Sequence, residues 1–204
     1  MDAGFWLERW QRNEIGFHQP RPHPALARLW PSLGLGPGTR VFVPLAGKSL
    51  DLLWLAAQGH DVVGIELSAI AVRDFAAEHG QPARIDLRCG DLFDLAPAAL
   101  GPIDAVFDRA SLVALPPAMR QRYAAQLAAL SPPGTRSLLV TMEYDQARMP
   151  GPPHSVPEDE VRALFGHTHD VEFVERNTAL EDFPRFAQRG VDRLAEAVYR
   201  LTRR

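Results

Sequence analysis

The chain contains 204 residues, a length that suits one α/β domain or at most two small ones. Hydrophobic residues make up 46% and charged residues 23%, so the chain can bury a core, which excludes fibrous and wholly disordered proteins. The formal net charge of -3 gives no general attraction to nucleic acid or to anionic lipid. A single cysteine, Cys89, excludes an intramolecular disulfide and a cysteine-rich zinc site.

No targeting or membrane segment is recognisable in the sequence. The N-terminal residues carry charges throughout and lack the uninterrupted apolar stretch of a signal peptide. The longest apolar runs are far shorter than the roughly 20 residues that a membrane span needs. We therefore expect a cytoplasmic protein, and we expect it to be a monomer.

An N-terminal helical extension is predicted over residues 1–36. Its helices are expected at Phe5–Arg12 and His23–Leu33, and the loop between them contains Gly16 and several prolines. Gly34 is expected to end the second helix. With no internal repeat and no change of composition along the sequence, residues 1–204 are predicted to form one domain.

Strand-like and helix-like stretches alternate after this extension. Short apolar runs predict strands at Arg40–Leu45, Asp61–Glu66, Arg84–Cys89, Ile103–Phe107, Ser137–Thr141 and Asp170–Arg176. Apolar side chains at helical spacing predict helices from Ser49 to Gly59, from Ser68 to His79, over Pro116–Leu130 and over Glu158–Phe165. Cys89, in a predicted strand, is expected to be a small core residue.

This alternation predicts an α/β fold with an open, doubly wound, mostly parallel sheet that carries helices on both faces. The last segment leaves two possibilities open. Leu194, Ala197, Val198 and Leu201 fit the spacing of a helix, whereas a strand that closes the edge of the sheet fits the fold.

Open α/β sheets bind ligands beyond the carboxyl ends of their strands, near the point where strand order reverses. A dinucleotide would need three glycines in the first turn, which offers only Gly47. A P-loop is excluded because Phe42 stands where its first glycine would be needed before Lys48. S-adenosylmethionine has no pyrophosphate and needs a single close backbone approach, so it fits this turn better.

Acidic residues after the second and third strands support the S-adenosylmethionine interpretation. Glu66 follows Gly47 by 19 residues and can accept hydrogen bonds from ribose hydroxyls. Asp91 falls where an adenine edge would lie. Each acid also has a simpler explanation, because Glu66 can be a solvated acid at a helix start and Asp91 can cap the turn at Leu92 to Leu95.

Other kinds of catalytic site are not supported. The histidines lack metal-ligand spacing with carboxylates, so we expect no metal. No Gly-x-Ser-x-Gly motif is present, which argues against a serine hydrolase.

Several motifs, taken in order, resemble the thiopurine S-methyltransferase family over nearly the whole chain. They are Phe5-Trp6 with Arg9-Trp10, Gly16–Gln19, Val43–Ser49, Trp54-Leu55 with Gly59-His60, Val62–Ser68, Gly90-Asp91, Phe93–Leu95, Asp108–Pro116, Pro150–Pro153 and Gly190–Asp192. The resemblance implies a class I methyltransferase fold, which is Rossmann-like and seven-stranded. It also implies methylation of thiols, with thiopurines as the named acceptors and S-adenosyl-L-methionine as the methyl donor.

The resemblance also implies roles for individual residues. The residues expected to bind the cofactor are Trp10, Phe17, Leu45, Gly47, Glu66, Asp91, Leu92 and Arg109. Arg109 is also expected to reach into the active site, and Arg185 matches a second arginine near the acceptor. The N-terminal segment and Pro150–Pro153 are expected to act as lids.

The methyl acceptor stays open between two chemical classes. Aromatic or heterocyclic thiols are the first, with the arginines favouring an anionic sulfur and no protein nucleophile required. Bacterial relatives are associated with methylation of selenium or tellurium compounds, which implies small soft nucleophiles and a role in detoxification as the alternative. A non-catalytic binding module of the same fold would be expected to lose Gly47, Glu66 or Arg109, all of which are present.

Overall fold

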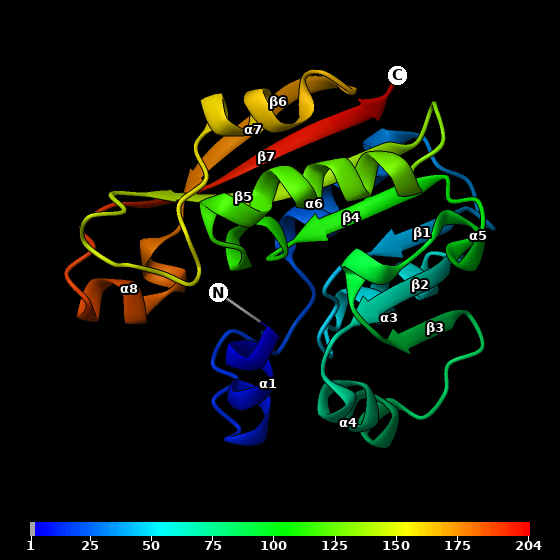
Figure 1. Cartoon of the computed structure of the whole chain (residues 1–204), viewed down its shortest axis with the longest axis horizontal. Helices are drawn as coiled ribbons and strands as arrows, with labels where there is room; N and C mark the ends of the chain where they lie inside the picture. Colours follow the sequence, from blue (N-terminus) through cyan, green and yellow to red (C-terminus); the bar gives the residue numbers. More distant parts are fainter. Residues whose placement is uncertain (1–2) are drawn as a thin grey trace.

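A computed structural model describes residues 3–204, so Met1 and Asp2 of the predicted extension lie outside the described residues. Its centre is a seven-stranded sheet in the order β3-β2-β1-β4-β5-β7-β6 (Figure 1). The strands are β1 Arg40–Val43, β2 Asp61–Glu66, β3 Ile85–Cys89, β4 Ala105–Arg109, β5 Arg136–Tyr144, β6 His169–Thr178 and β7 Leu194–Arg203. The pairs among β1 to β5 are parallel, while β7 runs antiparallel to β5 and β6. The predicted open, mostly parallel sheet is confirmed.

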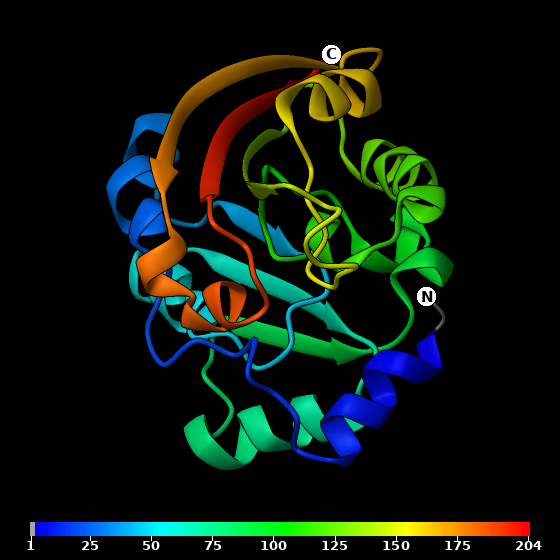
Figure 2. The same ribbon diagram turned by 90° about the vertical axis from the view of Figure 1, so that its left-hand side faces the viewer.

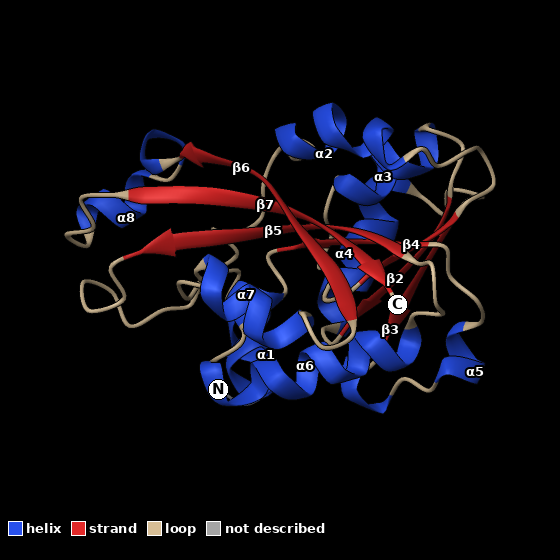
Figure 3. Ribbon diagram, turned by 90° about the horizontal axis from the view of Figure 1, so that it is seen from above, coloured by secondary structure: helices blue, strands red, loops and turns tan. Residues whose placement is uncertain are grey.

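Helices cover both faces of this sheet (Figure 3), with α2 and α3 on one side and α6 and α7 on the other. The α-helices are α1 Ala3–Gln11, α2 Pro24–Leu29, α3 Asp51–Ala57, α4 Ala69–His79, α5 Pro97–Leu100, α6 Pro117–Leu130, α7 Glu158–Phe165 and α8 Pro184–Gln188. The 3-10 turns are η1 Trp30–Leu33, η2 Leu92–Asp94, η3 Leu112–Ala114 and η4 Leu180–Asp182. Within residues 3–204 no helix is long and apolar enough to cross a membrane.

Strand β1 explains how the short apolar runs form two cores. Successive side chains of a strand point to opposite faces. Phe42 packs into the cluster beneath α6 and α7, whereas Val41 and Val43 pack into the cluster beneath α2 and α3. Because both faces are covered, all three residues are buried. A strand of this kind is continuously apolar in sequence.

The last segment is strand β7, and it lies inside the sheet between β5 and β6 rather than at an edge. The predicted strand is therefore confirmed, but its expected place at the edge of the sheet is wrong, and the helical alternative is wrong. Ala197, Tyr199 and Leu201 pack in one core while Val198 packs in the other. Burial on both faces hides the two-residue period, so helical spacing fits the apolar residues by coincidence.

Cys89 is exposed, which contradicts the expectation that it is a core residue. It ends β3, which is an edge strand with β2 as its neighbour in the sheet. An edge strand has one unpaired side and is only partly covered, so every side chain of β3 is half-buried or exposed.

Three segments distant in sequence gather at the carboxyl end of the parallel strands. Figure 2 faces this end and shows α1, α8 and the loop between β5 and α7 around it. Arg120 of α6 is buried and forms hydrogen bonds at the end of that loop. Its guanidinium donates to Ser155 O at 3.2 Å and to Glu160 of α7 at 2.7 Å. The proline-rich loop is thus fixed at its far end by a buried charged group.

Candidate active site

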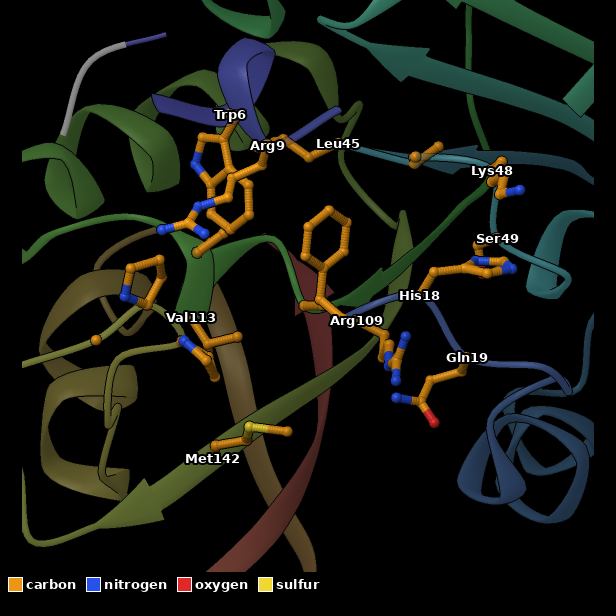
Figure 4. A pocket seen from close by; sticks show the side chains of 18 of the residues that line it. Trp6, Arg9, His18, Gln19, Leu45, Lys48, Ser49, Arg109, Val113 and Met142 are labelled. Atoms are coloured by element: carbon orange, nitrogen blue, oxygen red, sulfur yellow. The ribbon is translucent and has the colours of Figure 1, made fainter. Parts of the chain in front are cut away.

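A cavity of about 330 Å³ opens at this end of the sheet. It lies beyond β1, which is flanked by β2 and β4, so strand order reverses here as the general rule for open sheets requires. Figure 4 shows Trp6 of α1, Leu45 after β1 and Arg109 at the end of β4 around the same space. One part of the cavity adjoins the ends of β1 and β2, and the other adjoins β5 and α8.

Glu66 and Gly47 form the base of the part beside β1 and β2. Glu66 is 7% exposed, and its Oε2 accepts from Gly47 N at 2.8 Å while its Oε1 accepts from Ser68 N at 2.7 Å. Burial raises the pKa of Glu66, and the backbone N–H donors oppose that shift. Because its carboxylate is tied to the two turns that flank it, Glu66 is not an ordinary solvated acid at a helix start.

Gly47 occupies a position where a side chain would be strained. Its φ is 55°, in the left-handed region that favours glycine, and an added Cβ would lie 3.5 Å from Trp10 Cζ2. A side chain here would stand between the backbone and the aromatic wall of the cavity. The single glycine of this turn therefore allows a ligand to approach the backbone closely.

Aromatic rings form the wall opposite this turn. Trp10 is 5% exposed, and its ring packs edge to face against Phe17 with centroids 5.6 Å apart. Trp6 packs on the other side of Phe17 at 5.4 Å. The structure thus brings six of the eight predicted cofactor residues together in one cavity lining: Trp10, Phe17, Leu45, Gly47, Glu66 and Arg109.

Three arginines line the cavity without a carboxylate partner. Arg109, Arg185 and Arg189 form no salt bridge within residues 3–204, although most other arginines in that range do. Arg185 donates to Gly16 O, which joins α8 to the N-terminal loop. Arg189 Nη1 lies 3.6 Å from Met149 Sδ. Unpaired guanidinium groups beside a cavity favour an anionic ligand.

Arg189 was not predicted from the sequence, although a signal for it exists. It follows Arg185 by four residues, and residues spaced in this way share one face of a helix. Arg185 lies in α8 and Arg189 is the residue that caps its C-terminus. The sequence predicts a loop in this region, so the four-residue spacing of Arg185 and Arg189 could not be assigned to the face of a helix.

Asp91 and Leu92 are absent from the residues that line the cavity. Asp91 Oδ1 accepts from Phe93 N at 2.8 Å and caps the turn η2, as its simpler explanation requires. Leu92 is 4% exposed and packs in the core beneath α6. Their contact with an adenine ring stays a prediction.

Lys48 does not resemble a phosphate-binding lysine in its surroundings. Its Nζ lies 2.5 Å from Glu78 Oε1 at the end of α4, and the side chain is largely buried. His18 lies nearby in the N-terminal loop, and its pKa is lowered by burial and then by the charge of Lys48. Among residues 3–204 no group of three or more His, Cys, Asp or Glu side chains has the arrangement of a metal site.

A buried carboxyl group lies directly behind the arginine of β4. Asp108 is 2% exposed, and its Oδ2 accepts from Tyr123 Oη at 2.7 Å. Burial raises the pKa of Asp108 to about 6. The sequence reasoning missed this residue because nothing local distinguishes a buried aspartate from an exposed one at the end of a strand.

Comparisons with known proteins agree with this geometry. A sequence model of the family described as Thiopurine S-methyltransferase (TPMT) matches residues 1–204. Proteins named thiopurine S-methyltransferase from Pseudomonas entomophila and Azotobacter vinelandii are 51% and 50% identical, and each alignment covers 100% of both chains.

A solved structure with a similar fold is 1,6-didemethyltoxoflavin-N1-methyltransferase of Burkholderia thailandensis, which contains S-adenosylhomocysteine. Its TM-score is 0.68 at 19% identity, over 98% of this chain and 87% of that one. A likeness at this identity supports the fold, and the sequence relatives supply the family. The chain therefore belongs to the thiopurine S-methyltransferase family and is an S-adenosylmethionine-dependent methyltransferase.

Proposed function

We propose that the protein transfers a methyl group to the sulfur of thiopurines or related aromatic and heterocyclic thiols. The observation that carries this proposal is the composition of one cavity. A buried carboxylate and a glycine turn lie on one side of it, and three guanidinium groups without carboxylate partners lie on the other. The first arrangement suits a nucleoside cofactor, and the second suits an anionic acceptor.

Glu66 retains capacity for the proposed ribose contact. A carboxylate has about four acceptor positions. Backbone N–H groups of Gly47, Leu67 and Ser68 donate to Glu66, so a position remains for a ribose hydroxyl. The methionine end of S-adenosylmethionine would approach the backbone at Gly47, beside Leu45. The residues present therefore fit the cofactor.

The aromatic wall suits a cation. S-adenosylmethionine supplies an electrophilic methyl group on a positively charged sulfonium. Trp10 and Phe17 line the cavity, with Trp10 beside the glycine turn. Aromatic faces attract cations, by roughly 0.5–1 kcal/mol at exposed sites and more where water is excluded. These side chains would hold the donor and shield it from water.

Arg109 and Arg185 are proposed to hold the acceptor. Guanidinium groups stay charged and donate several hydrogen bonds, so they stabilise a thiolate or the anionic form of a thiopurine. The acceptor sulfur forms a bond to the methyl carbon along the line on which the carbon–sulfonium bond breaks, giving a thioether and S-adenosylhomocysteine. An anionic sulfur already carries the electron pair, so no protein base is required.

Alignment of the two sulfur atoms would supply most of the rate enhancement. Holding two reactants in position contributes as much as about 7–11 kcal/mol in favourable cases. Residues 1–36 and the loop around Pro150–Pro153 are proposed to act as lids on a single domain of residues 1–204. Both segments line the cavity, through Trp6, Trp10 and Phe17 on one side and Pro152 and Pro153 on the other.

A methyl-transfer screen with radiolabelled S-adenosylmethionine tests the proposal. The acceptors would be thiopurines, aryl thiols, selenite and tellurite, and we expect the heterocyclic and aryl thiols to be labelled fastest. Preference for selenite or tellurite would instead favour a role in detoxifying small selenium or tellurium anions. Binding of S-adenosylhomocysteine without transfer to any acceptor would identify a binding module.

We further propose that the enzyme acts as a cytoplasmic monomer. The single cysteine, Cys89, allows no intramolecular disulfide, which suits a reducing compartment. Sedimentation of the purified protein with a mass near 22.6 kDa is expected. A mass twice as large would overturn the monomer.

A further inference from the structure

The turn after β4, which brings Arg109 to the cavity, has a strained backbone. Ala110 follows Arg109 with a φ of 69°, a left-handed conformation that non-glycine residues adopt at a cost. The turn after β1 has the same character, because Leu45 has a φ of 43°. Such conformations persist where surrounding contacts hold them.

The ladder between β1 and β4 stops short of both turns. Its parallel register pairs Val41 with Ala105 and Phe42 with Val106. Strand β1 then ends at Val43, and β4 continues to Arg109. The two strands separate at the point where strand order reverses, which opens the space for the cavity.

One side-chain hydrogen bond crosses this separation. Ser111 Oγ donates to Pro44 O at 2.8 Å, and Ser111 is 0% exposed. On the opposite side of the same turn, Gly47 N donates to the carboxylate of Glu66 at 2.8 Å. The turn that carries Leu45 and Gly47 is therefore held from β2 by Glu66 and from β4 by Ser111.

Ser111 also begins the turn η3, which supports a third wall of the cavity. Val113 O, in η3, accepts from His154 N at 2.6 Å. This bond ties η3 to the loop that contains Pro152 and Pro153. Ser111 itself is not among the residues that line the cavity. It thus lies where the glycine turn, Arg109 and the proline loop meet, without facing the ligand space.

We propose that Ser111 is a positioning residue for methyl transfer. Its bond to Pro44 sets the turn with Leu45 and Gly47 at a constant position relative to Arg109, and so aligns donor and acceptor. This inference rests on the proposed function, in which Gly47 approaches the cofactor and Arg109 contacts the acceptor. The Ser111 hydroxyl also interacts with Asp108, the residue before Arg109, so Ser111→Ala removes both contacts. Small misplacements of reacting groups have large effects on rate, so this loss is expected to lower turnover.

The test compares Ser111→Ala with a matched loss of a buried hydroxyl elsewhere. Thr135 is buried near the start of β5, at the opposite end of the sheet, and its Oγ1 donates to Pro132 O at 2.7 Å. Both Ser111→Ala and Thr135→Val should lower the melting temperature slightly. Only Ser111→Ala should lower kcat with a thiol acceptor, by about tenfold, and raise the Kd for S-adenosylhomocysteine, by about threefold.

A second comparison separates positioning from general loss of stability. In an Arg109→Ala background, Ser111→Ala should lower kcat by less than about threefold. The guanidinium group that Ser111 is proposed to align with the glycine turn is absent from that background. Its effect on the Kd for S-adenosylhomocysteine should persist, because that effect acts through the glycine turn. If Ser111→Ala folds poorly, Ser111→Cys retains a weak donor and should have a kcat between those of the wild type and the alanine variant.

Equal kcat and Kd values for Ser111→Ala and Thr135→Val would overturn the positioning role. So would a full tenfold loss of kcat from Ser111→Ala in the Arg109→Ala background. A wild-type protein that methylates no thiol would overturn the proposed function instead. The binding measurements with S-adenosylhomocysteine would still decide the role of Ser111 in that case.

Discussion

The two halves of the cavity are lined by different kinds of polar group. Beside β1 and β2, the binding groups are backbone atoms and the buried carboxylate of Glu66, all joined by hydrogen bonds. Beside β5 and α8, they are long side chains, and Arg185 and Arg189 are exposed. The first half is therefore preorganised for one cofactor. The second can reach ligands of several shapes, since long arginine side chains have many rotamers.

Under the proposed function, this contrast predicts that the half beside β5 and α8 determines specificity for the acceptor. A rigid cofactor half changes little between acceptors, because every transfer uses the same donor. Variation in acceptor can then be accommodated by a few side chains on a short helix and a loop. Substitutions in the two halves should accordingly separate cofactor binding from acceptor turnover.

Glu66→Ala should have the largest effect, on the cofactor half. Loss of the carboxylate removes the proposed ribose contact and leaves the N–H groups of Gly47 and Ser68 without their acceptor. Hydrogen bonds to charged groups contribute about 1.5–3 kcal/mol, so the Kd for S-adenosylhomocysteine should rise roughly 10- to 100-fold. Calorimetry measures this directly. An unchanged affinity would remove Glu66 from the cofactor site.

Asp108→Asn tests the buried carboxyl group next to Arg109 in β4, through the pH dependence of the free energy of unfolding. The pKa of Asp108 is raised to about 6, so between about pH 4 and pH 6 the native state binds more protons than the unfolded state. The contribution of Asp108 to the free energy of unfolding therefore falls as pH rises through this range and is constant above it.

The asparagine variant lacks this fall and can still accept from Tyr123 Oη. Its free energy of unfolding relative to the wild type should thus rise between pH 4 and pH 6, on the order of 2 kcal/mol. Urea denaturation at each pH measures the difference. Parallel stability curves for the two proteins would show that Asp108 titrates as it does in the unfolded chain.

Arg109→Ala and Arg185→Ala should affect the acceptor half and leave the cofactor half largely intact. We expect kcat/KM for an anionic aryl thiol to fall about tenfold, as loss of a charged hydrogen bond implies, with a smaller change in affinity for S-adenosylhomocysteine. Arg193→Ala is the matched control, because Arg193 is exposed in the same segment and does not line the cavity. Wild-type activity in both cavity variants would end the proposed role of these arginines.

Arg189→Gln should have the smallest effect. Arg189 is exposed and contacts Met149 Sδ, so solvent screens its charge. We expect KM for an anionic thiol to rise about threefold with kcat unchanged, and this rise should diminish at high salt. Steady-state kinetics at two ionic strengths measure both effects. A lower kcat at unchanged KM would instead place Arg189 among the residues that act in the transition state.

The strands and helices that carry the cofactor half were largely predictable from the sequence. Strand Asp61–Glu66 has the predicted bounds, and Ser68 caps α4 as expected. Away from this half, helix Glu158–Phe165 also has the predicted bounds. These elements are specified by local features, namely apolar runs, a cap and a terminating glycine. Glu66 ends strand β2 and Gly47 lies in the turn after β1, so the position of both follows from where open sheets place their ligands.

The acceptor half was only partly predictable. Arg109 ends strand β4 and matches a motif, whereas Arg189 depends on a helix of five residues that has no clear sequence signature. Strand β7 was ambiguous because burial on both faces removes the alternation that identifies a strand. Whether Asp108 is buried and whether Ser111 reaches Pro44 depend on segments that are far apart in the sequence.

The sequence by itself determined the class of fold, the absence of an intramolecular disulfide and the turn at Gly47 that suits a cofactor without pyrophosphate. These properties follow from composition, periodicity and local spacing, which are set within a few residues of the chain. Only the tertiary structure decided which arginines lack carboxylate partners around one cavity, and how Glu66 and Ser111 hold the turn between them. Such properties depend on long-range packing, which brings residues of distant segments within hydrogen-bond distance.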